Sequence, residues 1–471
     1  MNKKFYITTA IPYVNAAPHI GFALEMIQTD TLARYHRLLK EDVYFLTGSD
    51  ENSLKNVQAA EEKKIPVAKL VKQNSDKFYQ LKSVLNLSFN DFIRTTEERH
   101  TQGVQTFWKT CQKEDIYKKK YKGLYCIGCE TFYTEKDLID GRCPEHKTKP
   151  EIIEEENYFF RLSKYQSWLE KLITKDQLRI IPKIRKNEIL AFIQRGLEDF
   201  SISRSVKRAH GWGIPVPDDN QQIIYVWFDA LTNYITALDW QNNGSLFQKY
   251  WPADVHMIGK GISRFHTIYW PAMLKSVGVS LPKEVFIHGY ITINGEKISK
   301  SLGNIIDPFE MVKKYGIDPI RYYLLKEIPA YNDGDFSELR FKEVYNADLA
   351  NGLGNLVARV AKLCETANFK PKNLSNSNYT GLDKFLNEYR FDEALKFIWE
   401  KISEADHYLD DNKPWLLNGN ELSKILQNLV QKVQEITNLL TPFLPETAEK
   451  ILKQFQGPKI KAENPLFPRI K

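Results

Sequence analysis

The stretch FYITTAIPYVNAAPHIGFALEMIQTDTLARYHRLLKEDVYFLTGSD, residues 5–50, decides the fold of this chain. Residues 5–11 are β-branched or aromatic and predict a strand, and residues 43–47 predict a second, buried strand. Between them, apolar side chains at helical spacing predict a helix over residues 20–39. This order of elements indicates a doubly wound parallel sheet, which binds ligands at the carboxyl ends of its strands.

Polar residues and glycines lie at two such strand ends. His19 and Gly21 open the predicted helix, whose free N–H groups and positive dipole end suit a phosphate. Asp50 follows the second strand directly. A histidine at a helix start is more often a simple cap, so this motif alone is a weak indication of a nucleotide site.

Further along the chain the α/β pattern stops near residue 112 and returns near Gly211. Strands are expected at residues 223–228, 255–258 and 285–287, and the intervening residues 162–192 look helical and amphipathic. We predict an α/β fold: a Rossmann-like doubly wound parallel sheet with a zinc-bearing insertion, followed by an all-α helical bundle. The expected segments are 1–111 and 214–290 (the two halves of the α/β domain), 112–213 (the connective insertion), 291–345 (a segment with a lysine-containing loop) and 346–471 (the bundle).

Two stripes of apolar residues support the bundle. Leu349, Leu353, Leu356, Val360 and Leu363 step by four and three residues and predict one buried helix face. A second stripe comprises Val433, Ile436, Leu440 and Phe443. The Asn- and Ser-rich residues 371–380 predict a loop.

Composition excludes several classes of protein. No stretch approaches 18 uncharged apolar residues, so no spanning helix is expected, and no signal peptide is recognisable. Five cysteines are an odd count that predicts a reducing, cytoplasmic location. The net charge is +7, and residues 112–213 hold 21 basic against 16 acidic residues. This local excess fits a polyanion partner, although charge alone favours an ordinary solvated basic surface.

The insertion carries a metal-ligand pattern. Two residues separate Cys126 from Cys129, thirteen separate Cys129 from Cys143, and two separate Cys143 from His146. Three thiolates and one imidazole at this spacing predict one tetrahedral zinc ion, and four protein ligands make it structural. The alternative, four unrelated residues in a reduced protein, is much weaker. Cys111 and Cys364 lie outside the pattern and are expected in the core.

A loop with two lysines lies about 280 residues after His19. Lys297, Ile298, Ser299, Lys300 and Ser301 follow a glycine-containing turn. Two lysines on a mobile loop suit the charge of a polyphosphate leaving group, although alone such a loop is more simply read as a solvated basic surface.

Together the two motifs resemble those of the class I aminoacyl-tRNA synthetases. Further stretches of the sequence resemble the bacterial methionyl-tRNA synthetases along essentially the whole chain. The resemblance rests on residues 10–15 (AIPYVN), 45–50 (FLTGSD), 225–230 (YVWFDA), 258–260 (IGK), 297–301 (KISKS) and the predicted helix 346–359. It implies catalytic roles for His19, Lys297 and Lys300. It also implies that ATP is bound by His19, Gly21, Gly259, Lys297, Ser299 and Lys300, with Mg2+ bridging the phosphates.

The resemblance further implies a methionine pocket and an anticodon surface. The pocket residues would be Ile11, Tyr13, Asp50, Trp227, Ala230, Leu231, Tyr234, Ile262 and His266, with Asp50 meeting the ammonium group. An aromatic-lined slot suits a polarisable thioether, and Tyr234 and His266 are candidates for weak hydrogen bonds to its sulfur. From sequence alone, Trp227 and Tyr234 would be ordinary core. The tRNA anticodon would contact Asn355, Arg359 and Trp415, since amide, guanidinium and indole groups read and stack unpaired bases.

The activity implied is ATP-dependent formation of methionyl-adenylate from L-methionine and its transfer to the 3′ end of tRNA(Met). Two positions depart from the family pattern: Phe22 stands where a second His is usual, and Gly261 where an Asp is usual. They leave open a tRNA-binding protein of synthetase ancestry with weak or lost adenylation. Synthetases for leucine, isoleucine or valine carry an editing insertion for which this chain has no room. The chain ends at Lys471, shortly after the bundle, which predicts a monomer.

Overall fold

The computed structural model describes residues 3–128, 130–133, 135–144, 147–298, 303–371, 379 and 381–471. The chain forms two compact units. The first comprises Met1–Pro18, Lys40–Lys82 and Ser88–His288, and the second His19–Leu39, Ser83–Leu87 and Gly289–Lys471. The helix after the first strand thus belongs to the second unit. The five segment boundaries expected from the sequence remain a prediction.

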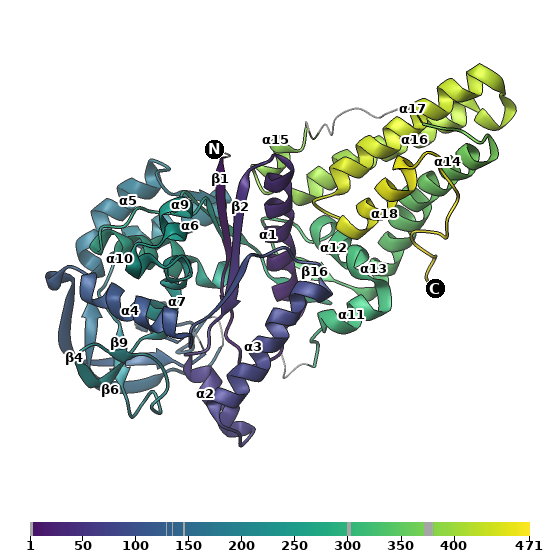
Figure 1. The fold of residues 1–471 in the computed structure, drawn as a ribbon. Coiled ribbons are helices and arrows are strands. Elements are labelled where there is room, and N and C mark those ends of the chain that lie inside the picture. Colours follow the sequence, from purple (N-terminus) through teal and green to yellow (C-terminus); the bar gives the residue numbers. More distant parts are fainter. Residues whose placement is uncertain are drawn as a thin grey trace. The chain divides into compact units, whose positions relative to one another are not determined.

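A six-stranded parallel sheet forms the centre of the first unit (Figure 1). Its strand order is β3 (Asp91–Arg94), β2 (Asp42–Ser49), β1 (Lys4–Thr9), β12 (Val255–Gly259), β13 (Glu284–His288) and β7 (Arg179–Ile181). In register, Ile7 of β1 lies opposite Phe45 of β2 and Val255 of β12. All three of these side chains are fully or almost fully buried, which is why the central strands read as apolar runs.

The sheet confirms the doubly wound topology expected from residues 5–50. The chain runs from β1 outward through β2 to β3, and later from β12 to β13 on the opposite side of β1. The helices of this unit are α2 (Leu54–Glu62), α3 (Val67–Val84), α4 (Glu98–Thr110), α5 (Gln166–Thr174), α6 (Lys183–Gln194), α7 (Val226–Leu231), α8 (Asn233–Thr236), α9 (Ser245–Tyr250) and α10 (Trp270–Ser276).

The expected strand at residues 223–228 is wrong in its second half. Strand β11 (Asp219–Ile224) ends before Tyr225, and helix α7 begins at Val226. The strand also pairs antiparallel with β9 (Ser203–Ser205) and β10 (Pro215–Val216), outside the parallel sheet. A short apolar run has no periodicity that separates a buried strand from a buried helix, so the sequence could not place this change.

The insertion differs from expectation in one place, since its expected helical stretch contains strand β7, which joins the parallel sheet beside β13. Besides α5 and α6, the insertion contains an antiparallel sheet of β5 (Thr131–Tyr133), β4 (Ile116–Cys126), β6 (Glu151–Phe160) and β8 (Phe200–Ser201). Lysines of β4 face glutamates of β6: Lys120 lies opposite Glu156, and Lys122 opposite Glu154. This pairing neutralises part of the local basic excess.

The second unit begins with α1 (Ile20–Leu38) and continues with a small sheet of β15 (Glu296–Lys297), β14 (Ile291–Ile293) and β16 (Gly334–Phe336). Its other helices are α11 (Pro308–Tyr315), α12 (Ile317–Lys326), α13 (Glu338–Val344), a π-helical segment (Tyr345–Gly354), α14 (Asn355–Thr366), α15 (Asp383–Leu386), α16 (Phe391–Asn412), α17 (Gly419–Leu440) and α18 (Pro445–Gln456). The long helices α16 and α17 lie side by side in this bundle (Figure 1).

Both predicted core stripes are found in the bundle. Of the first, Leu349, Leu353, Leu356 and Val360 are buried and Leu363 is half-buried. All four residues of the second are buried. Most of the loop predicted at residues 371–380 lies outside the described residues. None of the helices in the described part of the chain is both long enough and apolar enough to cross a membrane.

Candidate functional site

The candidate amino-acid site lies at the carboxyl ends of the three central strands. Strand β1 has β2 on one side and β12 on the other, so the direction of winding reverses between β1 and β12. Ligands of open α/β sheets bind at such a switch point. The segment after β1 runs beside the end of β2, because Tyr13 and Asp50 form a parallel bridge and the Asp50 N–H donates to the Pro12 carbonyl at 2.8 Å.

An aromatic wall faces this strand edge. Helix α7 carries Trp227, whose ring stacks on Phe265 at 3.8 Å and lies edge-on to Tyr13 at 6.1 Å between ring centroids. The nine predicted methionine-site residues all belong to the first unit. Six are buried, namely Asp50, Trp227, Ala230, Leu231, Tyr234 and His266, and three are half-buried, namely Ile11, Tyr13 and Ile262.

Tyr234 and His266 bond to each other. His266 Nδ1 lies 3.0 Å from the Ile262 carbonyl, which can only accept, so this nitrogen carries the proton. The other nitrogen, Nε2, then accepts from the Tyr234 hydroxyl at 2.7 Å. Burial lowers the pKa of His266 to about 4, which keeps the ring neutral. Both donors proposed for the methionine sulfur are therefore already used within the protein in this arrangement.

Asp50 lies in a buried acidic environment. Burial raises the pKa of Asp50 well above its usual value, and the nearby Asp229 carboxylate raises it further. Asn52 links the two acids: its backbone N–H donates to Asp50 Oδ1 at 3.2 Å and its side-chain amide to Asp229 Oδ2 at 2.7 Å. His100 Nε2 lies 2.6 Å from Asp229 Oδ1. Such a cluster favours a cationic ligand, because a positive charge would offset the like-charge repulsion.

Three members of this cluster, Asn52, His100 and Asp229, are absent from the site predicted by sequence. Asp229 lies within the stretch 225–230 that carries the family resemblance, so a signal for it exists. His100 lies in α4 with no local motif around it, and only the fold brings it to Asp229.

Two buried donors at this site have no hydrogen-bond partner among the described residues. They are the Tyr13 hydroxyl and Trp227 Nε1. Buried polar groups are nearly always satisfied in native proteins. Two orphaned donors beside one strand edge therefore indicate a place where a ligand or water completes the bonding.

His19 caps the helix expected to bind phosphate. Its Nδ1 accepts the Gly21 N–H at 3.1 Å, and burial lowers its pKa to about 4, so the ring is neutral and its Nε2 carries the proton. A Cβ on Gly21 would lie 2.9 Å from the His19 ring, which explains the glycine. The Phe22 ring packs on His19 with 4.4 Å between centroids. His19 can therefore cap α1 through Nδ1 and donate to a phosphate through Nε2.

The other predicted nucleotide residues are only partly described. Gly259 ends strand β12 at the carboxyl edge of the parallel sheet. Gly261 is exposed in the 3-10 turn Lys260–Ile262 that follows. Ser299 and Lys300 lie outside the described residues, as does the side chain of Lys297.

Two of the four predicted zinc ligands, Cys129 and His146, also lie outside the described residues. The other two are buried and meet the same residue: Cys126 Sγ lies 3.8 Å from Thr148 Oγ1, and the Cys143 N–H donates to the Thr148 carbonyl at 2.9 Å. Within the described part of the chain, no three potential ligands form a metal-binding group. The two described cysteines lie on separate segments that both contact Thr148, and the zinc site stays a prediction.

The predicted anticodon residues lie on the bundle. Asn355 is exposed at the start of α14, and Arg359, one turn later, pairs with Asp406 at 3.5 Å and Asp410 at 2.5 Å. Trp415 is 52% exposed in the 3-10 turn Pro414–Leu416. A tryptophan with half its surface in water is available for stacking, as the prediction requires.

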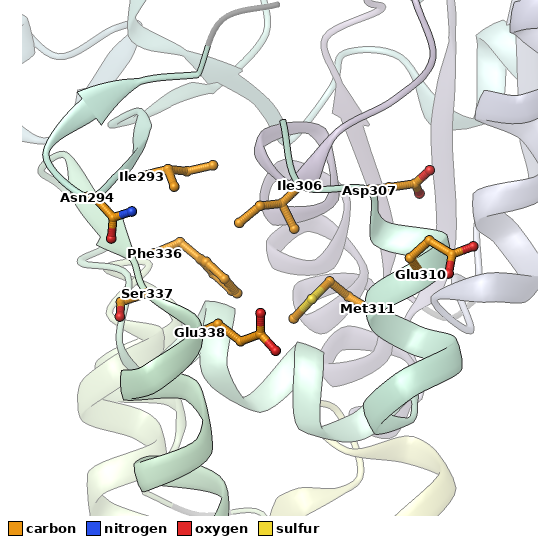
Figure 2. Close-up of a pocket in the computed structure, with 9 residues that line it drawn as sticks. All are labelled: Ile293, Asn294, Ile306, Asp307, Glu310, Met311, Phe336, Ser337 and Glu338. Carbon is orange, nitrogen blue, oxygen red and sulfur yellow. The ribbon is translucent and has the colours of Figure 1, made fainter. Parts of the chain in front are cut away.

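A hollow of about 320 Å³ lies in the second unit, between β14, β16 and α11. Figure 2 shows apolar side chains around it, with the Glu338 carboxylate beside Met311 and the carboxylates of Asp307 and Glu310 farther to the right. It is lined by Ile293, Asn294, Ile306, Asp307, Glu310, Met311, Phe336, Ser337 and Glu338. None of these belongs to the predicted site. Glu338 is bonded to Lys314 and Tyr315, and Asp307 caps α11, so two of the three carboxylates already have structural roles.

Family models and curated relatives that match this chain belong to the same family of proteins. The model for class I tRNA synthetases (M) matches residues 5–149 and 136–361, and the model for the anticodon-binding domain of tRNA ligase matches residues 376–470. The methionine--tRNA ligase of Thermotoga maritima is 44% identical over 96% of this chain and 75% of its own length. That of Brucella suis is 41% identical over 99% of this chain and 98% of its own length.

Solved structures agree. The Mycobacterium tuberculosis methionyl-tRNA synthetase in complex with methionyl-adenylate superimposes with a TM-score of 0.93 at 37% identity, covering 99% of this chain and 100% of that one. The ligand-free form of the same protein gives a TM-score of 0.85.

Proposed function

The chain belongs to the class I methionyl-tRNA synthetases, and from that premise we propose how its residues perform methionine--tRNA ligation. The enzyme activates L-methionine with ATP and transfers it to tRNA. In the first step the methionine carboxylate attacks the α-phosphate, and pyrophosphate leaves. In the second, a ribose hydroxyl at the tRNA 3′ end attacks the adenylate carbonyl, and AMP leaves.

The methionine assignment rests on one observation: the buried Asp50 carboxylate lies at the same strand edge as the aromatic wall of Tyr13, Trp227 and Phe265. We assign Asp50 to the substrate ammonium group and the aromatic wall to its thioether side chain. The raised pKa of Asp50 supports this, because a buried carboxylate facing another acid gains most from a cation. The thioether gains dispersion and sulfur–aromatic contacts from the rings.

We propose that discrimination against leucine comes from the two orphaned donors at the site. Since Tyr234 donates to His266, we propose that the Tyr13 hydroxyl and Trp227 Nε1 supply the polar contacts left for the ligand. Pyrophosphate exchange measured with each amino acid in turn tests the assignment. Methionine alone should support exchange; equal exchange with leucine or norleucine would contradict it.

For the phosphates we propose His19, Gly21, Gly259, Lys297, Ser299 and Lys300. The neutral His19 ring donates from Nε2, and the start of α1 adds its dipole. The two lysines offset the charge that develops on pyrophosphate, which is electrostatic catalysis by positioned groups. Mg2+, when bound to ATP, neutralises further phosphate charge.

We propose one structural zinc ion bound by Cys126, Cys129, Cys143 and His146. Metal analysis should find about one zinc per chain, and Cys143→Ser should release it while the bundle stays folded. A zinc-free preparation with unchanged stability and activity would contradict this site.

We propose that the bundle reads the tRNA(Met) anticodon through Asn355, Arg359 and Trp415, whose placement on one helix and one exposed turn supports the assignment. The enzyme is proposed to be a cytoplasmic monomer. Sedimentation at micromolar concentration tests the oligomeric state, and a dimer would contradict it.

A further inference from the structure

Glu130 bonds to both sides of the candidate methionine site, although it lies in the insertion. It follows Cys129 in sequence and is fully buried. Its backbone has φ of +54°, a left-handed conformation that is uncommon for a non-glycine residue. A glutamate held in this conformation with no solvent exposure is expected to make specific contacts that offset the cost of its burial.

One carboxylate oxygen of Glu130 binds the start of helix α2. Oε1 accepts the Leu54 backbone N–H at 2.6 Å and the Lys55 backbone N–H at 3.3 Å. The first turn of α2 has no acidic residue of its own, so Glu130 supplies the negative charge that a helix N-terminus favours. Helix α2 begins four residues after Asp50, and its Asn56 side chain donates to the Asp50 carbonyl at 3.1 Å.

The other carboxylate oxygen is held by residues of the insertion. Oε2 accepts from Arg204 Nη1 at 3.0 Å and from the Tyr125 hydroxyl at 2.8 Å. The guanidinium of Arg204 lies 5.4 Å from the Tyr125 ring centroid and 5.2 Å from that of Tyr225. One carboxylate oxygen of Glu130 thus binds the start of α2 and the other binds the buried guanidinium of Arg204. The carboxylate cannot move without breaking the hydrogen bonds to one of them.

The backbone carbonyl of Glu130 makes the second link. It accepts the hydroxyl of Tyr225, the residue immediately before helix α7. That helix carries Trp227, Ala230 and Leu231. One residue thus binds the segment that follows Asp50 through its side chain, and the segment that precedes the aromatic wall through its backbone.

We propose that Glu130 is a positioning residue for methionine. It sets the spacing between the segment from Asp50 to the start of α2 and helix α7, which carries Trp227. This inference rests on the methionine site proposed above. Glu130 touches no substrate in this proposal, and its effect passes through α2 and Tyr225. Since a small misplacement of a binding group has a large effect, removing its charge should weaken methionine binding roughly tenfold to a hundredfold.

Glu130→Gln is the direct test. The amide can still accept the Leu54 N–H, but it places an NH2 group against Arg204 and Tyr125. Methionine affinity, followed by tryptophan fluorescence, should fall while zinc content is unchanged. In pyrophosphate exchange the methionine KM should rise and the ATP KM should stay within about twofold, a split that a merely structural role would not give.

A matched control is Asp115→Asn. Asp115 is also a buried carboxylate of the first unit, bonded to Tyr165, Ser276 and Lys164, and it contacts none of the nine methionine-site residues in the described bonds. It should lower the melting temperature without changing methionine affinity. If both variants lose stability and both keep wild-type methionine affinity, Glu130 is only structural and the proposal is overturned.

Two more variants keep the test decisive if Glu130→Gln folds poorly. Tyr225→Phe removes only the hydroxyl bond to the Glu130 carbonyl and should raise the methionine KM several-fold; an unchanged KM contradicts the proposal. The pair Glu130→Gln with Arg204→Gln removes the unpaired buried cation, so stability should recover while methionine affinity does not. Asp50→Asn separates the two proposals. If it leaves methionine affinity intact, the site itself is wrong; if it abolishes binding while Glu130→Gln binds normally, only the role of Glu130 fails.

Discussion

The proposed methionine site and the proposed anticodon surface differ in how far their side chains are exposed to water. At the first, Asp50, Tyr234 and His266 are almost fully buried, Tyr234 is hydrogen-bonded to His266, and Asp50 accepts the Asn52 N–H. At the second, Trp415 exposes half its surface and Asn355 is open to water. The first site is largely organised before its ligand arrives, whereas the second leaves its groups for the RNA to cover.

The difference follows from the size of each ligand. A small amino acid offers few contacts, so the site must bury it and keep its own groups in place beforehand. An unstacked base brings a large flat face, and an exposed indole can bind it without a cavity. Changes at the methionine site should therefore act on chemistry and on the stability of the fold, and changes at the anticodon surface should act on tRNA alone.

The largest effect is expected for Asp50→Asn. Removing one partner of a buried charge pair costs about 2–5 kcal/mol, so methionine kcat/KM should fall by roughly 30-fold to 4000-fold. The ligand-free protein should melt at a higher temperature, because the asparagine carries no charge to be buried or to be repelled by Asp229, the two main causes that raise the pKa of Asp50. Exchange kinetics and calorimetry measure both, and tRNA binding serves as the control. A stable variant with full methionine affinity would remove the contrast between the two sites.

The pH dependence of stability should follow the buried histidines. The pKa of His266 falls from 6.5 to about 4 on folding, so the unfolded chain binds the extra proton between these values. Its contribution to stability is full above pH 6.5 and is lost as pH falls through about 4, at about 1.4 kcal/mol per pKa unit. His19 has the same direction and value in the second unit.

Chemical denaturation of the wild type and of His266→Gln from pH 7 to pH 4 measures this effect. The wild type should lose more stability than the variant across that range. Parallel curves would mean that His266 is charged in the folded protein. Methionine affinity should be flat from pH 6 to 8, since the ring stays neutral throughout.

Trp415→Ala should affect the tRNA reactions only. A stacked base contributes roughly 1–3 kcal/mol, so aminoacylation kcat/KM should fall about 5-fold to 150-fold. Pyrophosphate exchange without tRNA should stay unchanged, and Trp415→Phe should recover most of the loss because it keeps a stacking face. Equal losses in both assays would show that Trp415 supports the fold instead.

The smallest effect is expected at Asp410, which pairs with Arg359 on the same surface. Asp410→Asn removes the shorter of the two ion pairs of Arg359, leaving the pair with Asp406, and removes a negative charge that repels phosphate. An exposed pair contributes only about 0.2–1 kcal/mol, so tRNA affinity should rise about 1.5-fold to 5-fold, with a steeper salt dependence. Weaker tRNA binding in this variant would mean that the pair orients Arg359 for its contact.

Local patterns in the sequence were sufficient for the four central strands of the sheet and for the core of the bundle. The first strand, helix and strand lie where residues 5–50 predict them, because a buried parallel strand and an amphipathic helix have distinct periodicities. The stripes from Leu349 and Val433 predicted the bundle core for the same reason. The identities of Asp50 and Trp227 came from resemblance, since an isolated acid and an indole on a helix have no distinguishing pattern.

Only the tertiary structure decided which residues meet. His100 reaches Asp229 across 129 positions, and Arg204 reaches Glu130 across 74, distances over which sequence periodicity carries no information. The change from β11 to α7 at Tyr225 also depends on long-range contacts, since the Tyr225 hydroxyl is held by Glu130. The sequence by itself determined the four central strands, the core faces of the bundle and the chemical groups available. The fold determined their pairing, because burial leaves each charged or hydrogen-bonding group dependent on partners that lie far away along the chain.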